Sequence, residues 1–166
     1  MAGANTNRSQ TRIDGANIAI IEARYYAEIN DQLMTGARRR ILAAGATFEH
    51  FTVPGALEIP QAVALCLAAG GISEPPKFDG YIAVGCVIRG ETTHYELVAG
   101  ESSRGLTDLS IQHGALIGNA ILTVENVTQA EVRADPDGQD KGGHAAEAVI
   151  QLIALQRHLR GNALDG

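Results

Sequence analysis

The stretch YIAVGCVIRGETTHYELV, residues 81–98, decides the fold class. Residues 81–88 are almost all apolar, which is typical of a strand that is covered on both faces of a parallel sheet. Polar residues follow, and Thr93 and Glu96 have the spacing of a capping box. We therefore expect a helix that begins near Thr92 or Thr93 and continues to residue 113. A buried strand that leads directly into a helix is the repeating unit of an α/β fold.

Short apolar runs and longer amphipathic runs alternate in the same way along the rest of the chain. We expect the other strands at residues 16–23, 46–53 and within 114–124. We expect the other helices at residues 26–45, 61–71, 126–134 and 144–160. Connections of this length predict right-handed crossovers within one parallel sheet. The expected fold is an α/β three-layer sandwich, in which a four-stranded parallel sheet carries helices on both faces.

The composition fits a single folded domain. The chain has 166 residues, of which 45% are hydrophobic and 19% are charged, and this is enough apolar surface for a core. We expect residues 1–14 to form a flexible tail and residues 15–166 to form one domain. A net charge of −6 gives no general attraction to nucleic acid or to an anionic membrane. No apolar run reaches the ~18 residues that span a bilayer, so we expect neither partner.

The two cysteines, Cys66 and Cys86, indicate a reducing compartment. They lack CxxC spacing, and the chain has no set of ligands with the spacing of a structural zinc site. The N-terminal residues also lack the apolar centre of a secretory signal. We expect two reduced thiols in a cytoplasmic protein, and no metal. A disulfide or a metal ligand is the alternative role.

Ligands of open parallel sheets bind beyond the carboxyl ends of the strands, and the segment after residue 88 carries the densest group of polar side chains. Gly90, Glu91 and Thr92 form a glycine-containing turn into a helix N-terminus, where free backbone N–H groups favour an anion. His94 follows in the first turn, and a histidine exchanges protons near neutral pH. The pattern indicates an anion site beside a proton donor. The alternative is an ordinary helix start with a surface histidine.

A second candidate wall is VPGALEIP, residues 53–60. Pro54 and Pro60 enclose an apolar turn with one carboxylate, Glu58, and such a turn can read the edge of a flat heterocycle with its backbone groups. The alternative is a rigid Pro-Gly turn in which Glu58 only stabilises a helix N-terminus.

Two further strand ends carry weaker signals. Tyr25 and Tyr26 follow the first strand, where an aromatic ring can stack on a planar ligand or lie at the edge of the core. Arg133 and Lys141 flank the loop before the last helix. They suit a phosphate, but on sequence alone solvated charges at helix ends are the favoured interpretation.

Taken together, the segments VPGALEIP, GCVIRGETTHYELV and GNAILTVENVTQAEVRA…DKGG closely resemble the lumazine synthase family of riboflavin biosynthesis. The resemblance covers nearly the whole chain beyond the first dozen residues, in the same order and spacing. It implies a flavodoxin-like α/β fold and a transferase. Members of the family condense 5-amino-6-(D-ribitylamino)uracil with 3,4-dihydroxy-2-butanone 4-phosphate, giving 6,7-dimethyl-8-ribityllumazine, phosphate and water. The resemblance implies no metal and no redox cofactor.

The resemblance also implies a role for each candidate residue. Tyr25 stacks on the uracil ring, and the other contacts to the ribitylaminouracil come from Ala56, Leu57, Glu58, Cys86, Val87 and Ile88. Glu91, Thr92 and Arg133 bind the phosphate, and His94 donates the proton, so His94 and Arg133 are the expected catalytic residues. Lys141 is a basic residue of a loop of the neighbouring site.

In this family each site lies between two subunits of a ring of five, so the resemblance implies a homopentamer. Asn119, Arg133 and Lys141 then reach into a neighbour's pocket. Three departures stand out. Asn119 occupies a position where many members have Phe, and Tyr25 replaces the commoner Phe. The loop ADPDGQDKG, residues 134–142, is acidic where shell-forming members have a glycine- and lysine-containing turn, which favours a free pentamer over a sixty-subunit shell.

Three other interpretations remain at this point. The chain is a different phosphate-using α/β enzyme, a flavin or lumazine carrier on the same scaffold, or a purely structural assembly protein. Asn119 leaves room for the carrier, whereas the presence of both His94 and Arg133 favours the enzyme.

Overall fold

The computed structural model describes residues 10–70 and 76–164. The strands of this part are β1 (Asn17–Ala23), β2 (Thr47–Val53), β3 (Gly80–Ile88) and β4 (Ile117–Val124). The helices are α1 (Ala27–Ala43), α2 (Glu58–Ala69), α3 (His94–His113), α4 (Val127–Ala134) and α5 (Lys141–Leu164).

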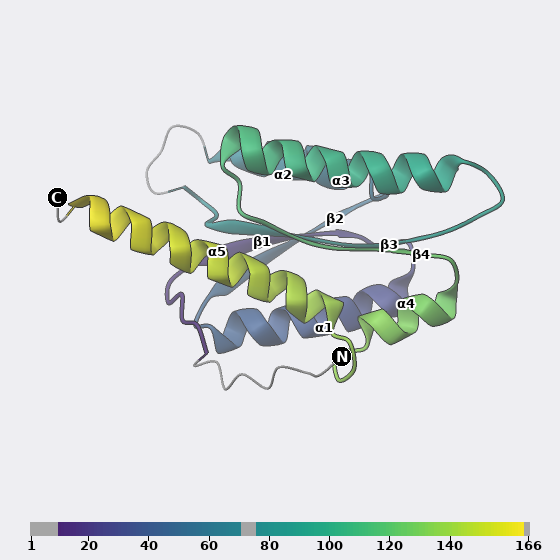
Figure 1. Cartoon of the computed structure of the whole chain (residues 1–166), viewed down its shortest axis with the longest axis horizontal. Coiled ribbons are helices and arrows are strands. Elements are labelled where there is room, and N and C mark those ends of the chain that lie inside the picture. Colours follow the sequence, from purple (N-terminus) through teal and green to yellow (C-terminus); the bar gives the residue numbers. More distant parts are fainter. Residues whose placement is uncertain (1–9, 71–75, 165–166) are drawn as a thin grey trace.

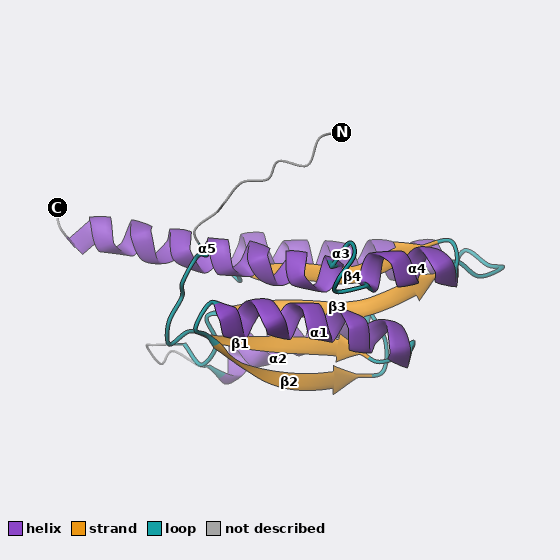
Figure 2. Ribbon diagram, turned by 90° about the horizontal axis from the view of Figure 1, so that it is seen from below, coloured by secondary structure: helices purple, strands orange, loops and turns teal. Residues whose placement is uncertain are grey.

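The four strands form one parallel sheet in the order β2-β1-β3-β4. Ile20 lies at the centre and pairs with His50 of β2 and Ile82 of β3. Helices α2 and α3 cover one face of the sheet, and α1, α4 and α5 cover the other (Figure 1). The arrowheads drawn in Figure 2 point to the same edge, where the loops that follow the strands meet. The expected α/β sandwich with a four-stranded parallel sheet is confirmed.

Side-chain alternation along the strands divides the core into two layers. Ile18 and Ile20 of β1 point to the face covered by α1 and α5, where they meet Leu33 and Val149. Residues in the odd positions of β1 point to α2 and α3, and Ile21 packs there with other buried apolar residues. Both central strands are therefore covered on two sides, as the apolar run at 81–88 predicted.

Two helices begin three residues before their expected positions. Helix α2 starts at Glu58, so Pro60 occupies its first turn. This position tolerates proline because the N–H groups of a first turn have no partner within the helix. Helix α5 starts at Lys141, directly after Asp140, whose Oδ1 accepts from N of Gly143 at 2.9 Å. Apolar periodicity missed both starts: the start of α5 depends on the cap by Asp140, and α2 begins in the turn before Pro60 without a side-chain cap.

Helices α1 and α5 approach each other so closely that glycine is required between them. A Cβ atom at Gly142 would collide with the carbonyl group of Leu33 in α1, and one at Gly36 would collide with the Asp140 side chain. Backbone cannot give way as a flexible side chain can, so this contact fixes the start of α5 and the position of Lys141.

Most of the segment expected to be a tail, residues 1–9, lies outside the described residues. Ile13 is fully buried, and its backbone N–H donates to the carbonyl oxygen of Ala44 at 2.9 Å. The packed chain therefore reaches at least to Ile13, while the division into tail and domain stays a prediction. None of the helices in the described part combines the length and the apolar character needed to cross a membrane.

Candidate active site

A cavity of about 430 Å³ opens at the edge of the sheet where the strands end. It is lined by the residues after β1, the turn after β2, the last residues of β3 and the start of α3. Eight of the residues expected from the sequence surround it: Tyr25, Ala56, Leu57, Glu58, Cys86, Val87, Ile88 and His94. The fold thus brings three separate sequence segments to one site. The cavity is also lined by Tyr26, Pro54 and Gly55, which lie in the segments that the sequence marked as candidates, and by Ala23 and Val98, to which the sequence assigned no site role.

Two tyrosine rings stand at the mouth of the cavity. Tyr25 is 74% exposed, and its ring meets that of Tyr26 edge-on, with centroids 5.0 Å apart. Partial burial raises the pKa of Tyr26, so its hydroxyl stays protonated at neutral pH. An exposed ring beside a cavity is available to stack on a planar ligand, and such contacts are worth about 0.5–1.5 kcal/mol beyond burial.

The turn after β2 forms a second part of the cavity lining. The backbone N–H of Glu58 donates to the carbonyl oxygen of Gly55 at 3.1 Å, which closes a tight turn. Gly55 is constrained by its neighbour, since a Cβ there would come within 3.0 Å of Oε2 of Glu58. Ala56 and Leu57 complete an apolar surface with one carboxylate at the start of α2.

The end of β3 forms a third part of the cavity lining. Cys86 is buried, while Val87 and Ile88 are half-buried. Burial raises the pKa of the Cys86 thiol to about 11, so at neutral pH it remains protonated and is a poor nucleophile. The site therefore offers a small apolar side chain at this position rather than a group for covalent catalysis.

The segment between β3 and α3 differs in part from the expectation. Helix α3 starts at His94 with Thr93 as its N-cap residue, as expected, but the Thr93 side chain makes no capping hydrogen bond. The capping box is therefore wrong. Glu96 instead accepts from Nη1 of Arg89, and Oγ1 of Thr92 accepts from N of His94 at 3.3 Å. Glu96 binds Arg89 rather than the backbone N–H of Thr93 because a charge-assisted hydrogen bond is stronger than a bond to the backbone.

Arg89 is a residue that sequence reasoning missed. Its guanidinium group lies over the ring of Tyr95, with 4.2 Å to the centroid, and Nε donates to Oε2 of Glu125 at 2.7 Å. The hydrogen bonds to Glu96 and Glu125 raise the pKa of Arg89 and keep it charged. Arg89 thereby joins the loop after β3 to the loop after β4. The only sequence signal for a role of Arg89 was its place in the VIRGET segment. Its partner Glu125 lies 36 residues away, so local pattern could not pair the two.

Five of the expected residues do not line the cavity within this chain. Glu91 and Thr92 are exposed on the loop before α3, and Lys141 is the first residue of α5. Asn119 is exposed on β4, where its Oδ1 accepts from N of Ile121 at 2.9 Å. Arg133 lies in the last turn of α4 and donates to the carbonyl oxygen of Gln129 at 3.0 Å. In consequence, no Lys or Arg is among the residues that line the cavity.

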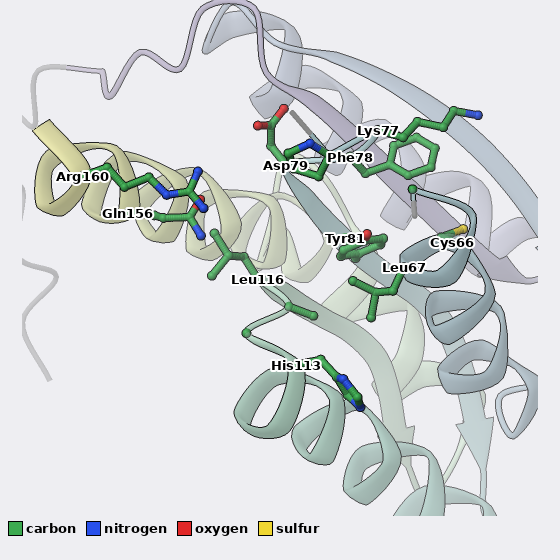
Figure 3. Close-up of a pocket in the computed structure, with 14 residues that line it drawn as sticks. Cys66, Leu67, Lys77, Phe78, Asp79, Tyr81, His113, Leu116, Gln156 and Arg160 are labelled. Carbon is green, nitrogen blue, oxygen red and sulfur yellow. The ribbon is translucent and has the colours of Figure 1, made fainter. Parts of the chain in front are cut away.

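A second, smaller cavity of about 190 Å³ lies at the opposite edge of the sheet, near the amino ends of β3 and β4. Figure 3 shows Tyr81 between Leu67 and Phe78, with Gln156 and Arg160 projecting from α5 and His113 at the end of α3. None of the residues expected to bind substrate lines this cavity. The larger cavity is therefore the candidate site. Among residues 10–70 and 76–164, no group of three His, Cys, Asp or Glu side chains is placed to hold a metal ion.

Comparisons with known proteins agree with this geometry. A sequence model of the 6,7-dimethyl-8-ribityllumazine synthase family matches residues 15–157. The chain belongs to this family. The protein of that name from Methylorubrum populi is 52% identical over 143 residues, which are 86% of this chain and 84% of the relative. The one from Afipia carboxidovorans is 48% identical over 150 residues, 90% and 91% of the two chains. The one from Novosphingobium aromaticivorans is 52% identical over 141 residues, 85% and 96% of the two chains.

Family membership confirms the resemblance seen in the sequence, the fold class and the assignment as a transferase. The match includes the segments that supply the cavity and also those that carry Asn119, Arg133 and Lys141. The three relatives are named as synthases and none as a carrier, so nothing in the comparisons supports the carrier alternative.

Proposed function

We propose that this chain condenses 5-amino-6-(D-ribitylamino)uracil with 3,4-dihydroxy-2-butanone 4-phosphate to 6,7-dimethyl-8-ribityllumazine, phosphate and water, the last step but one of riboflavin biosynthesis. The observation that carries the proposal is the cavity at the strand ends, where eight residues expected for this substrate pair meet around about 430 Å³. The names of the relatives supply the independent support.

The heterocycle is bound at the apolar end of the cavity, which Tyr25, Ala56 and Leu57 line. Tyr25 stacks on the uracil ring, and Ala56 and Leu57 form the wall against its edge. Glu58 accepts hydrogen bonds from hydroxyl groups of the ribityl chain, and Cys86, Val87 and Ile88 supply main-chain contacts from the end of β3. The exposed ring of Tyr25 and the tight turn at Gly55 support this placement.

The phosphate is bound at the other end of the site, where the loop with Glu91 and Thr92 leads into α3. This 20-residue helix directs its N-terminus and free N–H groups toward that loop. Because no cation lines the cavity in one chain, the charge of the phosphate needs a further partner. Arg133 supplies it, and Lys141 adds a second positive charge.

The reaction requires positioning and proton transfer, and no covalent enzyme intermediate. The 5-amino group attacks the butanone carbonyl, and water leaves as the imine forms. His94, which lines the cavity, moves the proton as C3 loses its hydrogen and the phosphate leaves C4. The resulting enol tautomerises to a carbonyl group at C3. The ribitylamino nitrogen then attacks the second carbonyl, and a further water leaves as the ring closes. Orientation of two bound reactants accounts for most of such an acceleration, and a positioned acid or base adds roughly 10²–10⁴-fold.

The assembly that completes the site is a homopentamer with each site between two subunits. Support comes from the absence of Arg133 and Lys141 from the lining of this chain's own cavity and from apolar side chains exposed on α2 and α3, such as Leu65, Leu97 and Ile111. Exposed apolar surface of this kind is typical of subunit contacts. The acidic loop before α5 favours a free pentamer. Two free cysteines, Cys66 and Cys86, support a cytoplasmic location.

The test is the initial rate of lumazine formation from the two substrates, followed by absorbance with and without protein. The blank is needed because the reagents condense slowly unaided. We expect a rate well above the blank and a loss of about 10²-fold in kcat for His94→Ala, with the affinity for the aminouracil nearly unchanged. The matched control is His113→Ala, at the other end of α3, which leaves the rate unchanged. A rate equal to the blank, together with tight lumazine binding, would make the chain a carrier instead.

A further inference from the structure

One fully buried carboxylate, Glu22, lies directly behind the turn that carries Tyr25. It occupies the sixth position of β1, and alternation along the strand turns it toward the α1 side of the sheet, whereas Ala23 points toward the cavity. The condensation proposed above does not use Glu22. A buried carboxylate is costly unless it is fully hydrogen-bonded, so its partners indicate what it does.

Three donors from three parts of the chain meet this carboxylate. Oε1 accepts from Nη1 of Arg24 at 3.0 Å and from Nδ2 of Asn30 at 3.1 Å. Oε2 accepts from Nε2 of His50 in β2 at 2.7 Å. Arg24 also donates to Asp31 at 2.7 Å, and these contacts raise its pKa. The group thus ties the end of β1 to α1 and to the neighbouring strand.

Asn30 extends the group to the backbone of the turn. Its Nδ2 donates to the carbonyl oxygen of Ala23 at 2.8 Å as well as to Glu22. Since both partners are acceptors, the amide can point only its nitrogen toward them. Its Oδ1 is left buried without a hydrogen-bond partner. The fold thus leaves one amide oxygen unsatisfied so that the Asn30 nitrogen can hold both the carboxylate and this carbonyl group.

The same carbonyl group fixes Tyr25. The backbone N–H of Tyr25 donates to the oxygen of Ala23 at 3.0 Å. The Tyr25 ring is largely exposed, so core packing does not determine where it lies. The orientation of the ring therefore depends on its edge contact with Tyr26 and on the backbone of residues 23–26. Arg24 and Asn30, both held by Glu22, restrain that backbone.

We infer that Glu22 is a positioning residue for recognition of the heterocycle: with Arg24, Asn30 and His50 it holds the turn at residues 23–26 so that the Tyr25 ring stands over the cavity. This inference rests on the proposed function, in which Tyr25 stacks on the uracil ring. Glu22 itself touches no substrate and acts from the far side of the sheet end.

The first test is Glu22→Gln, which keeps the shape of the side chain but replaces one acceptor oxygen by a donor and removes the charge. We expect the KM for the aminouracil to rise about five- to tenfold, because a ring displaced by a fraction of an ångström loses its stacking geometry. The kcat and the KM for the butanone phosphate stay within about twofold. The matched control is Glu49→Gln on β2, which removes the ion pair with Lys77, whose Nζ lies 3.3 Å from Oε2 of Glu49. This control leaves both KM values unchanged.

A second measurement observes the turn directly. The chain contains no tryptophan, so Tyr25→Trp introduces a single indole at the ring position, which can be excited apart from the remaining tyrosines. We expect the anisotropy decay of this indole to gain a fast component when Glu22→Gln is added, and not when Glu49→Gln is added. His50→Gln, at a partly exposed partner, gives a smaller change in the same direction and serves if the Glu22 variant does not fold.

Different outcomes would contradict the positioning role of Glu22 and the stacking role of Tyr25. A Glu22→Gln variant with a lower Tm but unchanged KM and unchanged indole motion would overturn the inference and leave Glu22 a structural residue only. A Tyr25→Ala variant with an unchanged KM for the aminouracil would instead overturn the assignment of Tyr25 within the proposed site.

Discussion

The residues expected to form the site fall into two regions that differ in what they offer a ligand. The cavity region, from Tyr25 to His94, supplies an exposed ring, an apolar wall and one carboxylate. The outer region, at α4 and the start of α5, supplies the cations Arg133 and Lys141, which are not among the residues that line that cavity. An anionic substrate needs both. A chain that separates them in this way fits our proposal that each cavity is completed by the outer region of a neighbour.

The largest expected effect comes from mixing variants of the two regions. His94→Ala and Arg133→Ala each lower kcat/KM by about 10²-fold or more. When the two inactive proteins are mixed under conditions of subunit exchange, some sites combine an intact His94 from one chain with an intact Arg133 from another. With equal amounts, about a quarter of the sites carry both. We expect activity to recover toward that fraction.

The control is exchange itself, shown by mass spectrometry of mixed assemblies in which one variant is isotope-labelled. Mixtures of either variant with itself define the background. Assemblies that have exchanged subunits but remain inactive would show that both residues act within one chain, and the division into two cooperating regions would be lost.

The outer region is held in place by Asp140. Replacing this residue should give a smaller effect than the mixing experiment. Asp140 has a positive φ of 46°, is largely buried, and accepts from N of Gly143 at 2.9 Å. Alanine removes the cap and tolerates this backbone conformation poorly, so we expect Asp140→Ala to lower the free energy of unfolding by about 1–2 kcal/mol. Asp140→Asn keeps an acceptor and adopts positive φ readily, so it stays close to the parent in urea denaturation.

The Asp140→Ala and Asp140→Asn variants also test whether the cavity region and the outer region bind different substrates. Displacement of the start of α5 moves Lys141, so Asp140→Ala raises the KM for the butanone phosphate but not that for the aminouracil. Equal changes in both KM values would mean that the cavity region depends on this corner, contrary to the separation described above.

The sequence predicted the features that depend on local pattern and missed those that depend on contacts between distant residues. The four strands and five helices follow from apolar periodicity and turn residues, which are local signals, and the cavity residues follow from the motifs at the strand ends. The networks of Glu22 and Arg89 were missed because their partners are remote: His50 is 28 residues from Glu22, and Glu125 is 36 residues from Arg89. The predicted capping box failed for a different reason: Arg89, only seven residues from Glu96 in sequence, binds the carboxylate that the capping box needed.

Arg89 lies where the two regions meet, because it holds the loop with Glu91 and Thr92 on one side and Glu125 at the end of β4 on the other. Its hydrogen bond to Glu96 lowers the pKa of that carboxyl group. The stabilising contribution of a carboxyl group with a lowered pKa is fully present above the usual glutamate pKa and is lost as the pH falls through the lowered value. At this exposed pair the contribution to stability is small.

Glu96→Gln therefore gives the smallest effect that we predict. Urea denaturation at pH 7 should show a slight loss of stability relative to the parent, and the difference should shrink as the pH falls below about 4, where the parent loses the same interaction. Glu101→Gln, which removes the exposed pair with Arg104 on the same helix, should show a similar pH dependence, because the pKa of Glu101 is also lowered. The two variants differ in the assay: Glu96→Gln loosens the loop that leads into α3 and raises the KM for the butanone phosphate, whereas Glu101→Gln leaves it unchanged. If both variants left this KM unchanged, Arg89 would not connect the two regions in any way that matters for phosphate binding, and its ion pairs would be surface contacts only.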